Sequence, residues 1–159
     1  MVAKYNETDT MPGQEFSTSH IFEAPINRVF EAWMDSKRVA QWWGPNGFTN
    51  PVCEINAWPG GSIRIDMRGP DGTVYPMSGV FKEIIKPETI VFGSSALDRD
   101  GRPIFDVVNT IAFADKDGKT ELSVHASVFN ATPAAAPYLQ EQEEGWAQTL
   151  GRLEAFLKG

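Results

Sequence analysis

The sequence predicts one α+β domain in which a curved antiparallel sheet of six or seven strands wraps around a long C-terminal helix. Three observations predict it. The chain has 159 residues, a length typical of one domain with its own core. Its middle alternates apolar and polar residues between Asp-Gly pairs, and its last segment carries an apolar stripe at helical spacing. We expect residues 1–13 to be a flexible lead and residues 14–159 to be the domain.

The first part of the domain predicts a strand followed by two short helices. Residues 15–23 show the mixed alternation of a strand. Pro25 then opens a helix, because a proline in the first turn lacks only an N–H that would be unpaired there. Asp35 or Ser36 can cap the second helix, which we expect to stop at Gly44-Pro45.

The middle of the chain predicts strands joined by tight turns. Three Asp-Gly pairs tolerate the positive φ angles that hairpin turns need: Asp71-Gly72, Asp100-Gly101 and Asp117-Gly118. Consecutive hairpins make an antiparallel meander. Residue parity assigns to its inner face Phe105, Val107, Asn109, Ile111 and Phe113, and from the next strand Leu122, Val124, Ala126 and Val128.

The C-terminal segment predicts one long helix. Thr132 is a candidate N-cap with Pro133 in the first turn, and the pattern then runs nearly unbroken to Lys158. Such a helix of about 25 residues is about 37 Å long. One apolar stripe faces the sheet: Leu139, Trp146, Leu150, Leu153 and Leu157. Gly145 and Gly151 each cost about 1 kcal/mol in a helix interior, so we expect a close approach of the sheet backbone or of a ligand there.

Composition excludes several functions. The net charge of −7 and the lack of a dense basic patch argue against nucleic-acid binding. No apolar stretch reaches the roughly 20 residues that cross a bilayer, and no secretory signal is present, so we expect a cytoplasmic protein without membrane insertion. The single cysteine, Cys53, excludes an internal disulfide and is predicted to be a small buried side chain.

The sequence holds no recognisable catalytic or metal-binding constellation. His20 and His125 are each flanked by serine within a strand and have no partner at metal-ligand spacing. Parity places His125 on the outer face. The Asp115 to Gly118 segment has the wrong spacing for a calcium loop and is predicted to be a hairpin. We therefore expect no catalytic residue, no metal and no cofactor, and enzymatic activity is the less favoured interpretation.

Several motifs resemble one known superfamily. In chain order they are Ala24-Pro25, residues 29–33 (VFEAW), residues 42–48 (WWGPNGF), Gly60-Gly61, residues 67–72 (MRGPDG) and Gly145-Trp146 with Leu150 and Leu153. The chain resembles the SRPBCC superfamily, which has the helix-grip fold of START domains, pollen-allergen-like proteins and polyketide cyclases. Within it the chain is most similar to the heat shock protein 90 ATPase activator homologue-like branch.

This resemblance implies an internal cavity between sheet and helix that holds an apolar small molecule. Our first hypothesis is such a binding module, a monomer or a homodimer. Its predicted walls are Ile63, Ile65, Met67, Phe81, Phe105, Val107, Tyr138 and Trp146, with Tyr75, Asn109 and Gln142 as polar groups. Those three polar side chains can instead bond to one another, and the aromatic side chains can instead fill the cavity.

Two other hypotheses remain. A cyclase or dehydratase acting in the same cavity needs a titratable side chain facing the ligand, for which Asp66, Glu83 and His125 are the residues to locate. A protein-interaction module needs a large exposed apolar patch, such as one around Trp42-Trp43 or Trp58. Activation of the chaperone is not expected, because the eukaryotic activator has a further N-terminal domain for which 159 residues leave no room.

Overall fold

The structure is a computed structural model that describes residues 15–159, so the lead predicted for residues 1–13 lies outside the described part. The element order follows the predicted one of strand, two helices, six strands and C-terminal helices. The elements are β2 (Glu15–Phe22), α1 (Ile26–Glu31), α2 (Ser36–Trp42), β3 (Thr49–Ile55), β4 (Ser62–Arg68), β5 (Val74–Ile85), β6 (Thr89–Leu97), β7 (Pro103–Lys116), β8 (Lys119–Phe129), η1 (Pro133–Ala135), α3 (Ala136–Gln140) and α4 (Gln142–Lys158).

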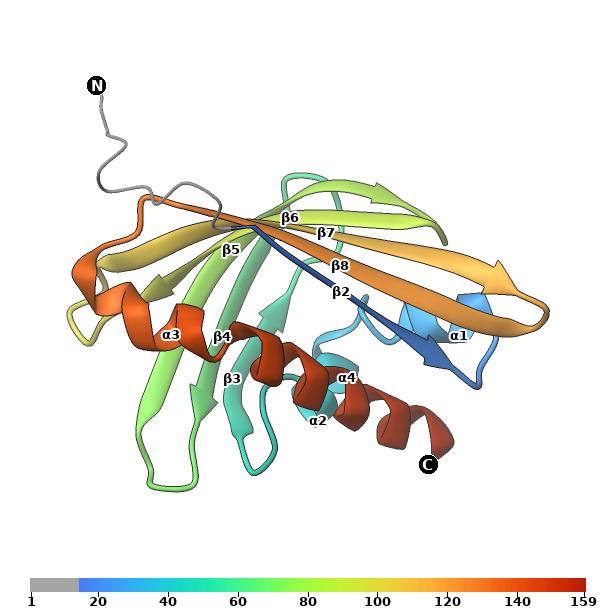
Figure 1. Cartoon of the computed structure of the whole chain (residues 1–159), viewed down its shortest axis with the longest axis horizontal. Coiled ribbons are helices and arrows are strands. Elements are labelled where there is room, and N and C mark those ends of the chain that lie inside the picture. Colours follow the sequence, from blue (N-terminus) through green and yellow to red (C-terminus); the bar gives the residue numbers. More distant parts are fainter. Residues whose placement is uncertain (1–14) are drawn as a thin grey trace.

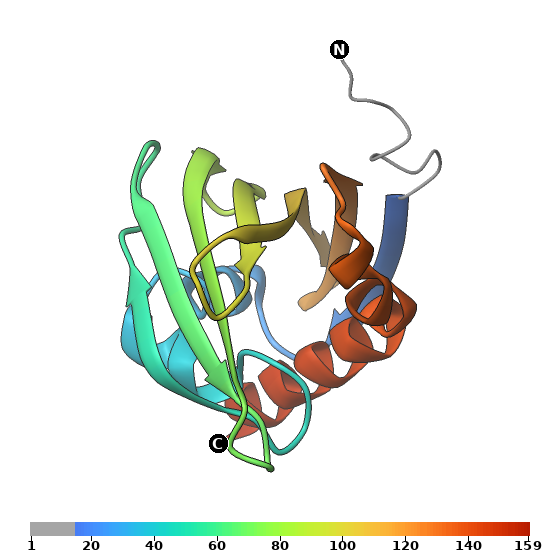
Figure 2. The same cartoon turned by 90° about the vertical axis from the view of Figure 1, so that its left-hand side faces the viewer.

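The strands within residues 15–159 form one seven-stranded sheet in the order β2-β8-β7-β6-β5-β4-β3. Every neighbouring pair is antiparallel, and β2 joins the meander at its far edge by pairing with β8. The sheet curves, and α4 runs across its concave side (Figures 1 and 2). This arrangement confirms the predicted fold.

The hairpins form where the Asp-Gly pairs predict them. Gly72 and Gly101 have φ angles of 89° and 82°, in the turns that join β4 to β5 and β6 to β7. In the turn between β7 and β8, both Asp117 and Gly118 have positive φ angles, 56° and 90°. The carboxylate of Asp115 accepts a hydrogen bond from the Gly118 N–H at 3.0 Å. The segment is thus a hairpin rather than a calcium loop.

Burial confirms the parity assigned to β7 and β8. Ile111 and Val124 are register partners and are 0% and 1% exposed. Phe113 and Leu122 form the next inward pair on the same two strands and are also buried. Outward-facing His125 is exposed. Alternation alone therefore predicts which side chains of these two strands lie on the concave face of the sheet.

The two short helices cover one end of the concave face. Asp35 caps α2 by accepting a hydrogen bond from the Arg38 N–H at 3.2 Å. Trp42 is fully buried, and its indole N–H donates to the Ala32 carbonyl oxygen. An exposed patch around Trp42-Trp43 is therefore a wrong prediction, because these rings pack into the core or against the pocket described below. Trp58 is 59% exposed.

The C-terminal segment was predicted to be one long, nearly unbroken helix, and the structure divides it into three. The segment consists of η1, α3 and α4, with Glu141 at φ −103° and ψ 10° between the last two helices. Pro137 lies in the first turn of α3 and has no N–H to continue a helix begun at Pro133. Thr132 does not cap with its side chain but donates a hydrogen bond to the Ile104 carbonyl oxygen. The 17 residues of α4 span about 25 Å.

The close approach of the sheet backbone that was one expectation for the two helix glycines is absent, and Gly145 lines the pocket described below. A Cβ atom built on Gly145 or Gly151 meets no atom within 4 Å outside its own helix backbone and chain neighbours. Neither glycine is needed for backbone packing against the sheet. The apolar stripe of α4 contacts the core instead through fully buried Leu150 and Leu153.

Candidate functional site: a pocket between the sheet and the C-terminal helices

The concave face of the sheet divides into a filled part and an open part. The filled part is the core, where α1, α2 and the C-terminal half of α4 cover the strands; its largest buried side chains include Phe22, Phe30, Trp42, Ile90, Ile111, Leu122 and Leu153. The open part is a pocket of about 530 Å³. The pocket lies under α3 and the first turns of α4.

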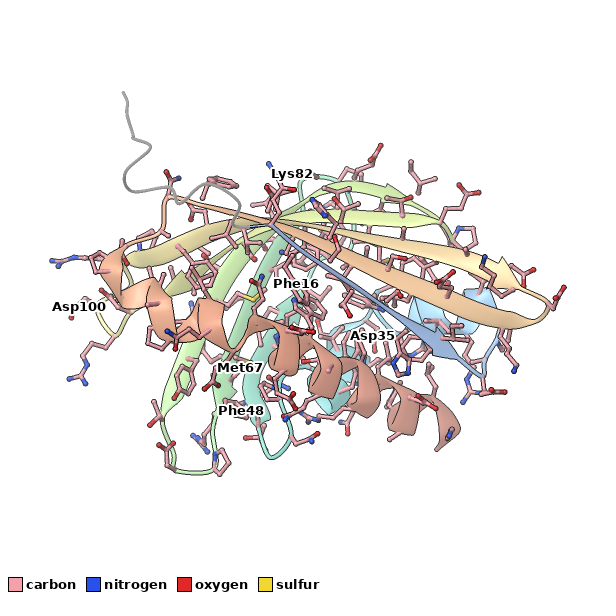
Figure 3. All side chains as sticks on the ribbon, in the orientation of Figure 1. Phe16, Asp35, Phe48, Met67, Lys82 and Asp100 are labelled. Atoms are coloured by element: carbon pink, nitrogen blue, oxygen red, sulfur yellow. The ribbon has the colours of Figure 1, made fainter. Side chains whose placement is uncertain are left out.

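Three parts of the chain build the pocket wall. The strands contribute Met67, Tyr75, Pro76, Met77, Phe92, Ser94, Ala96, Phe105, Val107 and Asn109. The helical side contributes Pro137, Tyr138, Leu139, Glu141, Gln142, Glu144, Gly145, Trp146, Gln148 and Thr149. The connection between α2 and β3 contributes Trp43, Gly44, Pro45 and Phe48. Figure 3 labels two of these side chains, Met67 and Phe48, which lie close to each other at the pocket.

Aromatic rings line much of this wall and contact one another. The Tyr138 ring lies 5.6 Å from that of Phe105 and 6.4 Å from that of Tyr75, so α3 is packed against both β7 and β5. At the other end, Trp146 contacts Trp43 at 5.9 Å between ring centroids. Edge-to-face contacts of this kind stabilise pairs of rings beyond their buried area. The rings therefore form a wall whose members hold one another in place.

One arginine holds the connection between α2 and β3 against α4. The Arg152 Nη1 group donates hydrogen bonds to the carbonyl oxygens of Trp43, Gly44 and Pro45 at 3.0, 2.9 and 2.9 Å. Burial lowers the pKa of Arg152 from its ordinary value. Gly44 has a φ angle of 96°, and a Cβ atom there would come within 2.9 Å of the Met67 sulfur. The positive φ angle favours glycine at this position, and a larger residue would also require the Met67 side chain to shift.

The buried amide on the inner face has partners other than those expected. Asn109 is 4% exposed, and its Nδ2 group donates to Ser94 Oγ at 3.2 Å and weakly to the Phe92 carbonyl oxygen at 3.5 Å. Within residues 15–159 no hydrogen bond joins Asn109 to Tyr75 or to Gln142. All three side chains line the pocket, but they do not satisfy one another.

The structure brings together eight of the eleven residues expected to line a cavity. These are Met67, Tyr75, Phe105, Val107, Asn109, Tyr138, Gln142 and Trp146. The other three, Ile63, Ile65 and Phe81, are 4%, 1% and 4% exposed and belong to the filled core. Their inward parity is right, but they lie farther along β4 and β5, where core side chains cover the face. Parity predicts which face of the sheet a side chain occupies. It does not predict at which residue along the strand the filled core gives way to the pocket.

Sequence reasoning missed part of the wall. Ser94 and Ala96 alternate with Phe92 on β6 and line the pocket, yet small side chains give no strong apolar signal. The role of Arg152 gives no signal in the sequence either, because a charged residue off the apolar stripe of a helix usually contributes only polar surface. A stripe of alternating small residues opposite aromatic ones is the signal that could have located the open part of the sheet.

The titratable side chains in the described wall are two tyrosines and two glutamates. Burial, with Tyr75 and Asp98 nearby, raises the pKa of Tyr138 above its ordinary value. Glu141 and Glu144 lie on the helical side and are exposed. Asp66, Glu83 and His125 are not in the wall. Asp66 accepts a hydrogen bond from Arg64 at 2.9 Å, and His125 bonds with Ser17.

The described residues contain neither a metal-binding cluster nor a membrane-spanning helix. Among residues 15–159, no group of three or more His, Cys, Asp or Glu side chains is placed to hold a metal ion. Over the same range, no helix has the length and apolar character needed to span a bilayer.

Comparison with known proteins agrees with the fold. The family model described as activator of Hsp90 ATPase homolog 1-like protein matches residues 23–158. A protein of Chromobacterium violaceum has a solved structure with a TM-score of 0.77 and 28% identity, covering 94% of this chain and 99% of that one. A protein of Arthrobacter aurescens gives 0.80 and 24%, covering 91% and 86%. A protein of Staphylococcus epidermidis gives 0.75 and 24%, covering 91% and 90%. No curated protein matches the chain.

Proposed function

The chain belongs to the activator of Hsp90 ATPase homolog 1-like family, and from the pocket in its fold we propose that it binds a small, largely apolar molecule between the sheet and the C-terminal helices. The observation that carries the proposal is the volume of about 530 Å³ left open on an otherwise filled apolar face. Pockets for small molecules commonly measure about 300–1,000 Å³.

The chemistry of the wall supports a ligand with a mainly apolar body. Apolar and aromatic side chains make up most of the strand side, and the buried amide of Asn109 is the strongest polar feature there. Mostly apolar walls with a few placed polar groups are typical of ligand pockets. Filling such a space with a ligand removes apolar surface from water, which provides the favourable free energy.

An enzyme acting in this pocket has less support. A general acid or base must lie within hydrogen-bond reach of the reacting group and have a pKa suited to its task. The carboxylates of Glu141 and Glu144 are exposed, and the pKa of Tyr138 is raised rather than lowered. Asp66, Glu83 and His125, the candidate acids or bases from the sequence, lie outside the pocket wall.

The test compares a variant with a filled pocket and one altered on the outer surface. Ala96 lines the pocket on β6, so Ala96→Phe places a ring in the open space. Val80 is 48% exposed, so Val80→Phe adds the same type of ring outside. Isothermal titration with 1-naphthylmethanol and 1-decanol is expected to give binding to the wild type and to Val80→Phe. Binding to Ala96→Phe should be at least about tenfold weaker, a difference of about 1.4 kcal/mol.

Native mass spectrometry of the freshly purified protein provides an independent readout. A bound small molecule should appear in the native spectrum and be lost on denaturation. Urea denaturation of both variants checks that each is folded. Equal binding to Ala96→Phe and wild type, or an empty wild type that binds neither probe, would overturn the proposal.

A further inference from the structure

The charges in the pocket wall are of one sign. Glu141 and Glu144 line the helical side, and the described wall contains no lysine, arginine or histidine. Glu144 accepts a hydrogen bond from Gln148 Nε2 at 2.9 Å, and Gln148 Oε1 accepts one from the Asn46 N–H. This amide is therefore occupied at both ends. The helical side of the wall offers carboxylate oxygens, and the Arg152 guanidinium at the edge of the pocket is already bonded to the carbonyl oxygens of Trp43, Gly44 and Pro45.

The buried polar group on the strand side is also an acceptor. The Nδ2 group of Asn109 is used by Ser94 Oγ and the Phe92 carbonyl oxygen. Its Oδ1 atom receives no hydrogen bond from any residue within 15–159 and is not a fully buried atom, so it is accessible from the pocket. A ligand that donates a hydrogen bond can use this acceptor, whereas a ligand that only accepts gains no hydrogen bond there.

The aromatic side chains of the wall also favour a cationic ligand over an anionic one. Seven aromatic side chains line the pocket: Trp43, Phe48, Tyr75, Phe92, Phe105, Tyr138 and Trp146. The face of an aromatic ring attracts a cation within about 6 Å of its centroid. The same faces attract no anion.

We propose that the ligand of this pocket is an amine: an apolar body carrying a protonated amino group near Glu141 and Glu144, with any further polar group a hydrogen-bond donor toward Asn109. This inference rests on the proposed binding function and names its ligand class. A carboxylate such as a fatty acid is disfavoured, because binding would add a negative charge beside two glutamates in a wall whose described lining residues include no cation. The ammonium group stays at the exposed carboxylates, so its desolvation is small compared with full burial.

Three probes that share a naphthyl ring and differ in their polar group test the ligand class separately from the proposed binding function. They are 1-naphthylmethylamine, 1-naphthylmethanol and 1-naphthoate, titrated into the full chain by calorimetry at low salt. We expect the amine to bind at least about tenfold more tightly than the carboxylate, with the alcohol between them. Raising the salt concentration to 0.5 M should reduce the difference, because exposed charges are then screened.

Neighbouring glutamates supply matched variants. Glu141→Gln and Glu144→Gln should each lower the ratio of amine to carboxylate affinity about threefold, the size of one exposed charge interaction. Glu143→Gln changes the net charge equally on the same helix, but Glu143 is not in the wall. That variant should leave the ratio unchanged. Asn109→Leu, or Asn109→Ser if the first does not fold, should weaken binding of the alcohol by about tenfold.

Each outcome is decisive. Alcohol binding with equal or tighter binding of the carboxylate would overturn the ligand class and leave the proposed function standing. An equal loss in Glu143→Gln would also overturn it, since the preference would then come from the overall charge of −7. Failure of all three probes to bind would overturn the proposed function together with the inference.

Discussion

Arg152 Nη1 donates a hydrogen bond to the Gly44 carbonyl oxygen at 2.9 Å, between residues 108 positions apart in the sequence. The same Nη1 group also serves the carbonyl oxygens of Trp43 and Pro45. This contact fixes the loop after α2 to the middle of α4. Since Gly44 also packs against Met67, one guanidinium group holds together the helix, the loop and the strand at this edge of the pocket.

We therefore expect Arg152→Met to destabilise the fold. The variant keeps most of the apolar stem but removes three hydrogen bonds. The Gly44 carbonyl oxygen loses its donor, whereas that of Trp43 keeps a hydrogen bond from Asn50 and that of Pro45 keeps one from the Phe48 N–H. The free energy of unfolding should fall by about 2 kcal/mol in urea denaturation. Lys158→Met on the same helix removes only an exposed ion pair with Glu154, so its change should stay below about 0.5 kcal/mol. Equal effects of the two variants would contradict the role given to Arg152.

Gly151→Ala is expected to stabilise the protein. A Cβ atom at this helix position meets open space, so the variant gains helix propensity without a clash. The free energy of unfolding should rise by about 0.5–1 kcal/mol. Gly61→Ala is the opposite case, because its Cβ would lie 1.9 Å from the Asn56 carbonyl oxygen. It should lose more than about 2 kcal/mol. A loss of stability in Gly151→Ala would show an unrecognised need for glycine there.

The contact between His20 and Glu154 predicts a pH dependence. His20 Nε2 donates to Glu154 Oε1 at 2.6 Å, and this bond, with Lys158, lowers the pKa of the Glu154 carboxyl from its ordinary 4.5. A lowered pKa in the folded state means stabilisation that is present above the ordinary pKa and lost as the pH falls through the folded value. His20→Leu should raise the pKa of Glu154, measured by carboxyl-carbon NMR.

The same variant should lose stability relative to the wild type at pH values above about 4.5, and the difference should shrink on further acidification. Lys119→Leu, which removes an exposed pair with Glu23, is the control. An unchanged pKa of Glu154 in His20→Leu would contradict the assigned cause.

Cys53 is expected to react slowly with alkylating reagents. The side chain is half-buried rather than fully buried as the sequence predicted. This partial burial, and secondly the charge of Asp35, raise the pKa of its thiol from 9.0 to about 11. Since the thiolate is the reactive form, a rise of two units lowers its population at pH 8 about 100-fold. Iodoacetamide labelling followed by mass spectrometry should therefore be slow in the folded protein and fast in urea. Fast labelling of the folded protein would show an accessible thiolate.

The local residue pattern was sufficient to predict the inward faces of β7 and β8 and the positions of three turns. Alternation of residue types at Ile111, Phe113, Leu122 and Val124 placed the correct sides of β7 and β8 inward, and the Asp-Gly pairs marked three turns. Both signals are local, since they depend on residues next to one another in the chain. The apolar stripe of α4 likewise predicted its buried side, although it gave no sign of the break at Glu141.

What the sequence by itself determined is the order of the elements, the inward faces of β7 and β8, and the family resemblance. The tertiary structure decided where the concave face is filled and where it is open. Ile65 and Met67 lie on one face of β4, but core side chains cover the first and the pocket adjoins the second. The partners of Asn109 and the carbonyl contacts of Arg152 were decided in the same way. Such contacts depend on the curvature of the sheet and on segments about 100 residues apart, which no local pattern records.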